Sequence, residues 1–439
     1  MSVCTSPTPT GIGPSSAPPD RRAPGRIELT SFLALSMALA ALGIDLLLPV
    51  YDSIRADLGL AVGATAVTGL ITTYFLGLAA GQLFYGPIAD RYGRKRALHI
   101  GYAIYGVAAL ATAIGPNLGV LLVARFVWGL GAAGPRVVTL AIVRDTYEGE
   151  RMAKAMSFIM AVFILVPVIA PSLAAGVATF VSWRWLAVGS AVAAVAAALW
   201  ARRIPETLAP EHQLPLTFSR IGAAARVVVS NRQTVGYTLA LTAMYGVFAS
   251  YLASSELIYD QVFDQSDRFP LIFGGLAAVM GVAMFTNGKV VERIGTRRLA
   301  HGVLIGYLVA ASGLVVMAVL TGGRPPLWVF LIGIAAMLVS HALLIPNFNT
   351  IAMTPMGAIA GTAASVIGAT QIAVGALLGA LLDRTFDGTI IPLSFGFLGY
   401  GVLAFCLVLY AERGRLFQRL VPSPTVEERA VAVADHEVV

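Results

Sequence analysis

Charged residues are scarce in this chain. Asp, Glu, Lys and Arg make up only 12% of the sequence, whereas soluble proteins average about 25%. Because 57% of the residues are hydrophobic, this composition excludes a water-soluble globular protein and indicates a membrane protein with many spans. The net charge of +7 does not indicate nucleic-acid binding, since the basic residues are scattered over short loops and are not gathered on one face.

Cysteine is scarce as well, and the motifs of most enzymes are missing. Cys4 lies in a polar stretch and Cys406 in an apolar run, so we expect no disulfide. The sequence has no paired metal ligands, no Cys-x-x-Cys, no phosphate-binding glycine loop and no nucleophile elbow. We therefore expect no enzyme activity, no metal and no cofactor. Any uphill transport would have to draw on an ion gradient.

Long apolar runs are abundant instead. A membrane helix needs about 20 apolar residues, and twelve runs meet this length. They predict an all-α membrane protein in which residues 29–201 and 233–411 form two six-helix bundles. Residues 202–232 are expected to be a cytoplasmic linker, and residues 1–28 and 412–439 cytoplasmic tails, the first of them disordered. The predicted spans are 29–50, 65–86, 97–115, 118–143, 155–180, 184–201, 233–258, 270–290, 299–320, 327–350, 360–382 and 391–411.

The distribution of Lys and Arg predicts the orientation. Of the 30 Lys and Arg residues, 23 fall on the side of both tails, five on the opposite side and two inside predicted spans. Cytoplasmic loops of membrane proteins carry the excess of basic residues. We therefore expect a multi-pass protein in the lipid bilayer of the cell (inner) membrane that has both termini in the cytoplasm.

A charged stretch, residues 81–96, joins the second and third predicted spans. We expect a tight loop in which Gly86 and Pro87 break the first helix and Gly93 allows a sharp turn. A buried Asp90 among arginines would hold the two helix ends together, or the basic residues only set the orientation. The residues that this prediction involves are Gly86, Asp90, Arg91, Gly93 and Arg94.

The same pattern returns 202 residues later in the chain. Residues 288–298 repeat the spacing of residues 86–96, with Gly295 in the place of Gly93. The second copy lacks the proline and one arginine. A repeat of half the chain indicates two related halves, as in many transporters.

Two charged residues lie at similar depth inside predicted spans. Asp45 is in the first span and Arg125 in the fourth, and a charge inside the membrane suggests a function. The pKa of a carboxyl group responds to desolvation and to a nearby cation, so Asp45 could alternate between Arg125 and a proton. The alternatives are a static ion pair or a helix cap at the interface.

Further polar residues are candidates for a substrate cavity. Arg136 lies three helical turns after Arg125 and either meets an electron-rich part of a substrate or, as we prefer, pairs with Asp145 or Glu148. For Glu256 we prefer a solvated position at the interface. For His341, and for Gln371, we prefer hydrogen-bonded packing between helices. The candidate cavity residues are Arg136, Tyr245, Glu256, His341 and Gln371.

Two prolines occur in the fifth predicted span. Pro167 and Pro171 are four residues apart, and each removes a backbone hydrogen bond. They predict a kinked helix, which suits either a moving interface between halves or ordinary packing.

Several motifs together resemble the major facilitator superfamily and, within it, the Bcr/CflA-type drug:proton antiporters. Residues 81–96 resemble the loop between the second and third helices of that superfamily. The resemblance extends over residues 27–415. Its other matching stretches are residues 125–131, 141–149, 170–171, 183–185, 205–207, 346–347 and 360–365.

The resemblance implies a twelve-helix transporter for multidrug efflux that exports small lipophilic drugs or xenobiotics in exchange for protons, by alternating access. It implies that Asp45 and Arg125 couple transport to protons and that the chain works as a single twelve-helix unit, a monomer. The residues that it assigns to a cytoplasmic gate are Gly86, Asp90, Arg91, Gly93 and Arg94. Glu256 and Arg136 depart from the family pattern, so the resemblance does not extend to substrate preference. The alternative is an importer or facilitator of a small anionic nutrient or metabolite, in which Arg136 selects the anion.

Overall fold

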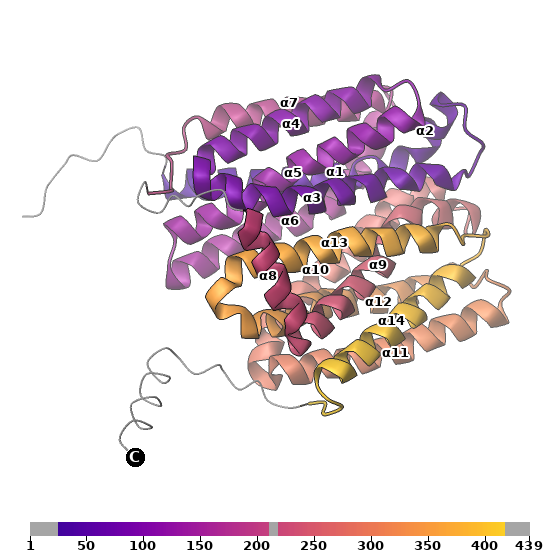
Figure 1. Ribbon diagram of the computed structural model, residues 1–439. Coiled ribbons are helices and arrows are strands. Elements are labelled where there is room, and N and C mark those ends of the chain that lie inside the picture. Colours follow the sequence, from indigo (N-terminus) through magenta and orange to yellow (C-terminus); the bar gives the residue numbers. More distant parts are fainter. Residues whose placement is uncertain (1–24, 210–217, 418–439) are drawn as a thin grey trace, which may run out of the picture.

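The protein is built from two helical bundles that lie side by side. A computed structural model describes residues 25–209 and 218–417, and the remaining residues, which include most of both predicted tails, lie outside this description. The described part contains twelve helical segments long and apolar enough to cross a membrane, which confirms the predicted fold class. In Figure 1 the first bundle, from α1 to α7, lies above the second, from α9 to α14.

The first bundle holds six long helices, and short helical segments join the first two of them. The long helices are α1 (Arg26–Asp45), α3 (Gly69–Tyr92), α4 (Arg94–Ile114), α5 (Leu118–Thr146), α6 (Gly149–Ala178) and α7 (Arg184–Ala201). The short α2 (Tyr51–Asp57) and the 3-10 turn η2 (Thr65–Thr68) connect α1 to α3.

The second bundle repeats this plan. Its helices are α9 (Arg232–Gln261), α10 (Phe269–Ile294), α11 (Thr296–Leu320), α12 (Leu327–Met353), α13 (Ala360–Asp383) and α14 (Ile391–Ala411). A further helix, α8 (Phe218–Ser230), lies in the segment between the bundles, which the sequence predicted only as a linker.

The turn between α3 and α4 is shorter than predicted. α3 continues through Pro87 to Tyr92, so the prediction that Gly86 and Pro87 end this helix is wrong. Inside a membrane bundle, neighbouring groups can satisfy the backbone that a proline leaves open. The turn consists of Gly93 alone, whose φ is 95°, a conformation that suits glycine because it has no Cβ. Gly295 repeats it in the second half with a φ of 88°.

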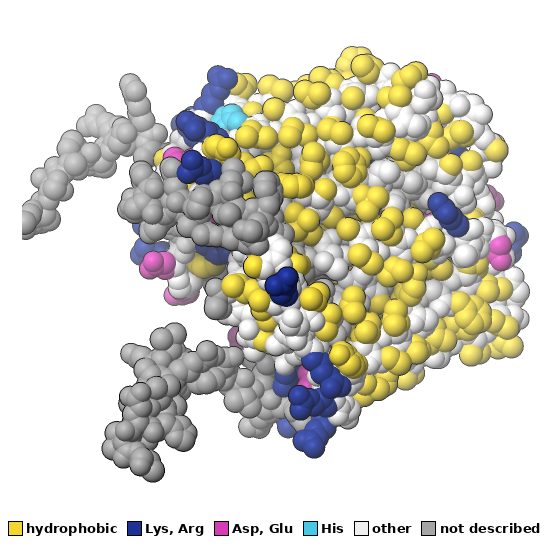
Figure 2. Space-filling model, viewed as in Figure 1, with side chains coloured by type: hydrophobic (Ala, Val, Ile, Leu, Met, Phe, Trp, Pro, Cys, Tyr) yellow, Lys and Arg dark blue, Asp and Glu magenta, His cyan; other side chains and the backbone are white. Residues whose placement is uncertain are grey.

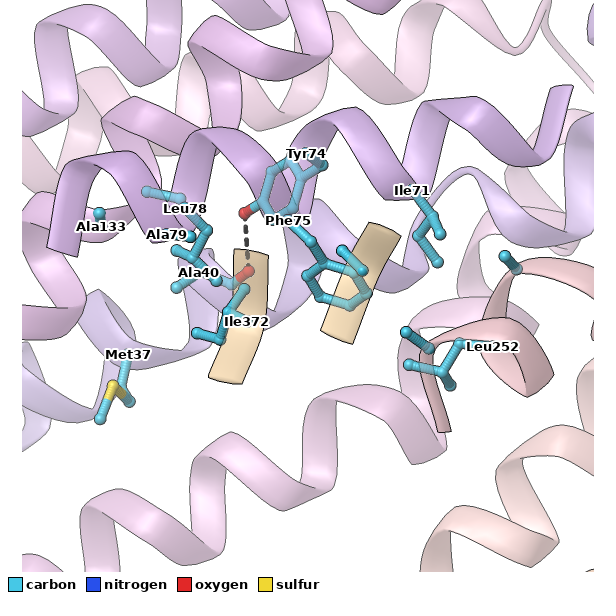
Figure 3. Packing of buried hydrophobic residues seen from close by; sticks show 14 of the residues in the cluster. Met37, Ala40, Ile71, Tyr74, Phe75, Leu78, Ala79, Ala133, Leu252 and Ile372 are labelled. Carbon is cyan, nitrogen blue, oxygen red and sulfur yellow. Dashed lines mark hydrogen bonds between the residues drawn. The ribbon is translucent and has the colours of Figure 1, made fainter. Parts of the chain in front are cut away.

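Within the first half, α3 and α5 approach each other very closely. A side chain at Gly77 would meet the backbone of α5 at Phe126, and one at Gly129 would meet the backbone of α3 at Tyr74. Small residues at such positions allow membrane helices to pack backbone against backbone. The same contact brings Tyr74 next to α1, where its hydroxyl donates a hydrogen bond of 2.8 Å to the carbonyl of Ala40 (Figure 3).

The two halves meet mainly along two helix pairs, α3 with α13 and α6 with α10. Figure 3 shows the first contact from close by, with Ile71 and Phe75 of α3 near Ile372 of α13 and Leu252 of α9. The contact is apolar, which leaves the two bundles free to tilt against each other without breaking many hydrogen bonds.

The surface divides into a belt and two ends. Figure 2 shows hydrophobic side chains over the middle of the visible face, with most of its Lys and Arg at the left end. We call this left end the basic end; it carries Gly93, Gly295 and α8 (Figure 1). We call the other end, with α2 and η2, the opposite end. An apolar belt between two polar ends is the surface that a bilayer requires.

Candidate functional site

A cavity of about 200 Å³ lies between the two halves. Helices from both bundles line it, and most of the lining side chains are apolar or aromatic. Its polar groups are few, and Asp45, Arg136 and Tyr245 are among them. Phe75 of α3 and Tyr245 of α9 meet edge to face across the halves, with ring centroids 5.5 Å apart. The cavity therefore joins the two bundles and presents a small number of polar groups on an apolar wall, as ligand sites usually do.

Asp45 reaches this cavity from a break in the first span. α1 ends at Asp45, and the chain resumes as a 3-10 turn, Leu48–Val50, that contains Pro49. The side chain is only 3% exposed, and none of the described residues forms an ion pair or a hydrogen bond with its carboxyl group. The break in the helix thus places an unpaired acid in the wall of the apolar cavity.

Arg125 lies close enough to Asp45 to act on it electrostatically, but the two side chains form no ion pair, so the alternative of a static ion pair is not what the structure shows. Its guanidinium is 4.5 Å from the ring centroid of Tyr74 and 5.0 Å from that of Trp128. Its Nε donates to the carbonyl of Leu70 at 3.2 Å, and its buried Nη1 has no partner among the described residues. Two aromatic faces thus hold the cation in place of a carboxylate.

Arg136 lines the cavity together with Asp45. The preferred prediction, that it pairs with Asp145 or Glu148, is wrong. Asp145 instead accepts from Arg94 at 2.9 Å. In the part of the chain that the structure describes, Arg136 forms no ion pair, so its charge is available to whatever occupies the cavity.

Glu256 lies outside the cavity, and the preferred prediction that it is solvated is also wrong. It is 4% exposed and accepts two hydrogen bonds from Arg55, of 3.0 Å and 2.9 Å. Arg55 belongs to α2 of the first half and is 2% exposed, with Asp52 as a second partner. A buried, bidentate ion pair therefore joins the two halves at the opposite end.

Of the three remaining candidates for the cavity, Tyr245 lines it, whereas His341 and Gln371 do not. His341 is fully buried outside it, where its ring nitrogens lie 2.8 Å from the carbonyl of Met337 and 2.9 Å from that of Met244. This is the packing role that the sequence favoured. Gln371, on α13, is not among the residues that line the cavity.

At the basic end, Arg94 connects three segments of the first half. It bonds to Asp90 of α3 at 2.7 Å and to Asp145 of α5 at 2.9 Å. The predicted burial of Asp90 is wrong, because its side chain is 43% exposed. Arg91 forms no ion pair within the described ranges. Gly86 lies inside α3, facing Ser365 of α13.

Sequence analysis missed the part that Glu206 plays at this end. Its carboxylate accepts from the backbone N–H groups of Arg94 at 2.8 Å and Lys95 at 3.1 Å. A carboxylate at the first turn of a helix complements the positive end of the helix dipole. The segment after α7 is thereby fixed to the start of α4. The stretch around Glu206 matched the family, but its spacing gave no sign of this contact.

Pro167 and Pro171 lie within one uninterrupted helix, α6, that runs from Gly149 to Ala178. Pro167 also lines the cavity. The kink stays a prediction.

Two bundles of six helices around a buried acid define a secondary membrane transporter, and comparison with known proteins gives its family. The chain belongs to the Major Facilitator Superfamily, whose family model matches residues 33–380. It resembles the crystal structure of a D-xylose–proton symporter with a TM-score of 0.70 over 90% of this chain and 98% of that chain, at 14% identity. This last likeness shows the shared fold.

Two curated relatives are similar over most of their length. The bicyclomycin resistance protein homolog of Haemophilus influenzae is 29% identical over 83% of this chain and 90% of the relative. The chloramphenicol resistance protein of Pseudomonas aeruginosa is 28% identical over 84% of this chain and 85% of the relative. The resemblance to the Bcr/CflA-type group is thereby confirmed.

Proposed function

We propose that this protein exports small lipophilic drugs or xenobiotics across the cell membrane in exchange for protons, by alternating access, without a cofactor. The observation that carries this proposal is the carboxyl group of Asp45, buried and unpaired in an apolar cavity between the two halves. An ionised carboxylate without a partner is costly there, so it favours a proton or a polar ligand. The names of the relatives support drug export.

Asp45 and Arg125 provide the proton step. When Asp45 gives up its proton, Arg125 supplies a positive charge within electrostatic range and has an unpartnered Nη1 that can donate to the carboxylate. When Asp45 takes up a proton, the guanidinium of Arg125 keeps its contacts with the rings of Tyr74 and Trp128, so the free energy of the buried cation changes little. A proton and a substrate would therefore compete for the same carboxyl group, which is what exchange requires.

The ion pair of Arg55 and Glu256 provides the outer gate. We take the basic end as cytoplasmic, in agreement with the excess of Lys and Arg there, so that this pair lies at the external end. The structure then represents a state closed to the outside. Opening to the outside would separate Arg55 from Glu256, because they belong to different halves. At the basic end, the contacts of Arg94 hold the first half together as it moves.

The cavity wall suits a lipophilic substrate. Phe75, Phe163, Phe248 and Phe273 supply aromatic faces, and such walls bind by shape and burial. The test is efflux of a lipophilic fluorescent cation or an amphenicol from cells that make the wild type or Asp45→Asn. We expect efflux that follows the pH gradient from the wild type only. Unchanged pH-dependent efflux from Asp45→Asn would remove Asp45 from the mechanism.

Arg136 supports a second candidate, import of a small organic anion. Its unpaired cation in the cavity is the specific observation in favour. Uptake of a labelled anion down its gradient, without any drug resistance in the expressing cells and with loss of uptake in Arg136→Gln, would favour import. We expect drug resistance instead, with Arg136→Gln altering which drugs are exported.

A further inference from the structure

Asp383 is a second buried acid, for which the mechanism above has no use. It is the last residue of α13 and is 5% exposed at the opposite end of the second half. One oxygen, Oδ1, accepts a hydrogen bond of 2.5 Å from the hydroxyl of Ser250 on α9. The other, Oδ2, is buried and has no partner among the described residues.

Asp383 differs from other buried acids in having no cationic partner in contact with it among the described residues. Two other buried acids have one, since Glu256 pairs with Arg55 and Glu412 with Arg297. In the ranges that the structure describes, Asp383 forms no ion pair. The neighbouring Arg384 is exposed.

The helices packed around Asp383 offer mainly hydroxyl groups, and the basic side chain that borders the same cavity, that of Arg384, forms no ion pair with it among the described contacts. Titratable groups within electrostatic range are Tyr51 of α2 and Tyr400 of α14. The hydroxyl of Tyr400 donates to the carbonyl of Leu378, so it is not free to serve the acid. α9 contributes Ser250, while η2 and α3 contribute threonines. The end of α13 adds the negative pole of its helix dipole, which disfavours an ionised carboxylate further.

A cavity of about 450 Å³ borders Asp383. Its wall comes from both halves, with Leu377 and Asp383 on α13, Arg384 directly after this helix, and threonines on η2 and α3. The threonines are Thr65, Thr68, Thr72 and Thr73. A cavity of this size with hydroxyl groups in its wall has room for water. Because it lies where α3 meets α13, tilting of the two halves changes its shape and its access to water.

We propose that Asp383 is a second proton-binding site of the transporter, distinct from Asp45. Its carboxyl group holds a proton in the closed state described here. When the halves separate at the opposite end, water in the threonine-lined cavity exchanges this proton with the external solution. The O–H bond of the carboxylic acid breaks, water takes the proton as hydronium, and Ser250 continues to donate to the carboxylate. The two sites are arranged alike, since each acid ends a helix, one helix in each half.

Infrared spectroscopy of the purified full chain tests the bound proton directly. We expect the wild type at neutral pH to show the C=O stretching band of a protonated carboxylic acid, and Asp383→Asn to lose one component of it. Asp387→Asn is the matched control, because Asp387 is exposed near the same end; it should leave the band unchanged. An identical band in wild type and Asp383→Asn would overturn the proposal.

A second variant keeps the test decisive if Asp383→Asn does not fold. Ser250→Ala removes the donor that stabilises the ionised carboxylate. Its protonated band should therefore persist to a higher pH than in the wild type. A band with an unchanged pH profile would count against the proposal.

The number of protons moved per drug molecule tests whether the proton on Asp383 is transported. This part of the proposal rests on the proposed drug:proton exchange. In proteoliposomes, the pH gradient that just balances a known drug gradient gives the number of protons per drug. We expect Asp383→Asn to lower this number by about one while drug binding is kept, and an unchanged number would overturn a transported second proton. If the wild type moves no protons with drug, the exchange proposal fails, and the infrared result still decides whether Asp383 holds a proton.

Discussion

At the scale of single residues, the position of Arg125 could be predicted and its partners could not. A charge inside an apolar run marks a buried site from sequence alone, which placed Asp45 and Arg125 correctly in the membrane. The rings that hold Arg125 come from Tyr74, 51 residues earlier in the sequence, and from Trp128 on its own helix. The side chains that contact Arg125 are determined by how α3 packs on α5, and no pattern in a single sequence predicts this packing.

The same holds for Arg55 and Glu256, which are 201 residues apart. Each looked like an ordinary residue at the end of a span. Their burial depends on the two halves closing over them, so the sequence predicted a solvated position for Glu256 and gave no sign of its partner.

The contacts of Arg125 with two aromatic rings lead to a prediction for the conservative substitution of Arg125 by Lys. Arg125→Lys keeps the charge but loses the planar group that stacks on Tyr74 and Trp128. A desolvated cation–π contact contributes about 2 kcal/mol. We therefore expect the ammonium group of the lysine to move away from the two rings. Drug efflux driven by a pH gradient should fall about tenfold or more.

Efflux from proteoliposomes at equal protein content measures this. Arg151→Lys serves as the control, because Arg151 is exposed at the basic end, and it should transport like the wild type. Full activity of Arg125→Lys would show that charge alone suffices.

At the scale of helices, the sequence predicted most elements well. Twenty apolar residues define a span regardless of tertiary context, and α7 and α14 begin and end as expected. Two elements were missed for physical reasons. α3 continues through Pro87 because neighbouring helices support it. α8 lies in a segment that contains three prolines and is too short in apolar residues to form a span, so it did not stand out from the sequence.

The contact between α3 and α5 leads to a prediction about stability. Gly77→Val places a branched side chain against the backbone of α5 at Phe126. Because neither backbone can yield, we expect a loss of stability of more than about 2 kcal/mol. Gly189→Val on α7 is the control, since a side chain there meets no atom within 4 Å.

Thermal unfolding in detergent, followed by a fluorescent thiol probe or by loss of the gel-filtration peak, compares the two variants. A clear drop in Tm for Gly77→Val and little change for Gly189→Val is the expected result. Equal Tm values would mean that the two helices do not touch as described.

At the scale of the whole molecule, the two halves are joined by apolar contacts and by few charged ones, of which the pair of Arg55 and Glu256 is buried. Removing one partner of such a pair costs about 2–5 kcal/mol, and this cost falls on the closed state in which the pair forms. Glu256→Gln should therefore shift the population toward the state open at the opposite end.

Labelling with a membrane-impermeant thiol reagent from outside the cell measures that shift. The reporter is Leu252→Cys in the cavity wall, in a chain whose Cys4 and Cys406 are replaced. Glu256→Gln should speed the labelling, whereas the control Asp260→Asn, one turn further along α9, should not. Equal rates would show that the ion pair does not hold this end closed.

The most direct test of the account concerns the proton on Asp45. Purified protein in weakly buffered detergent solution is mixed with a transported drug, and the protons set free are measured with a pH indicator. The account predicts that drug binding releases protons from the wild type and that Asp45→Asn binds the drug without this release. Equal proton release from both proteins would contradict it, because the drug and the proton would then not compete for Asp45.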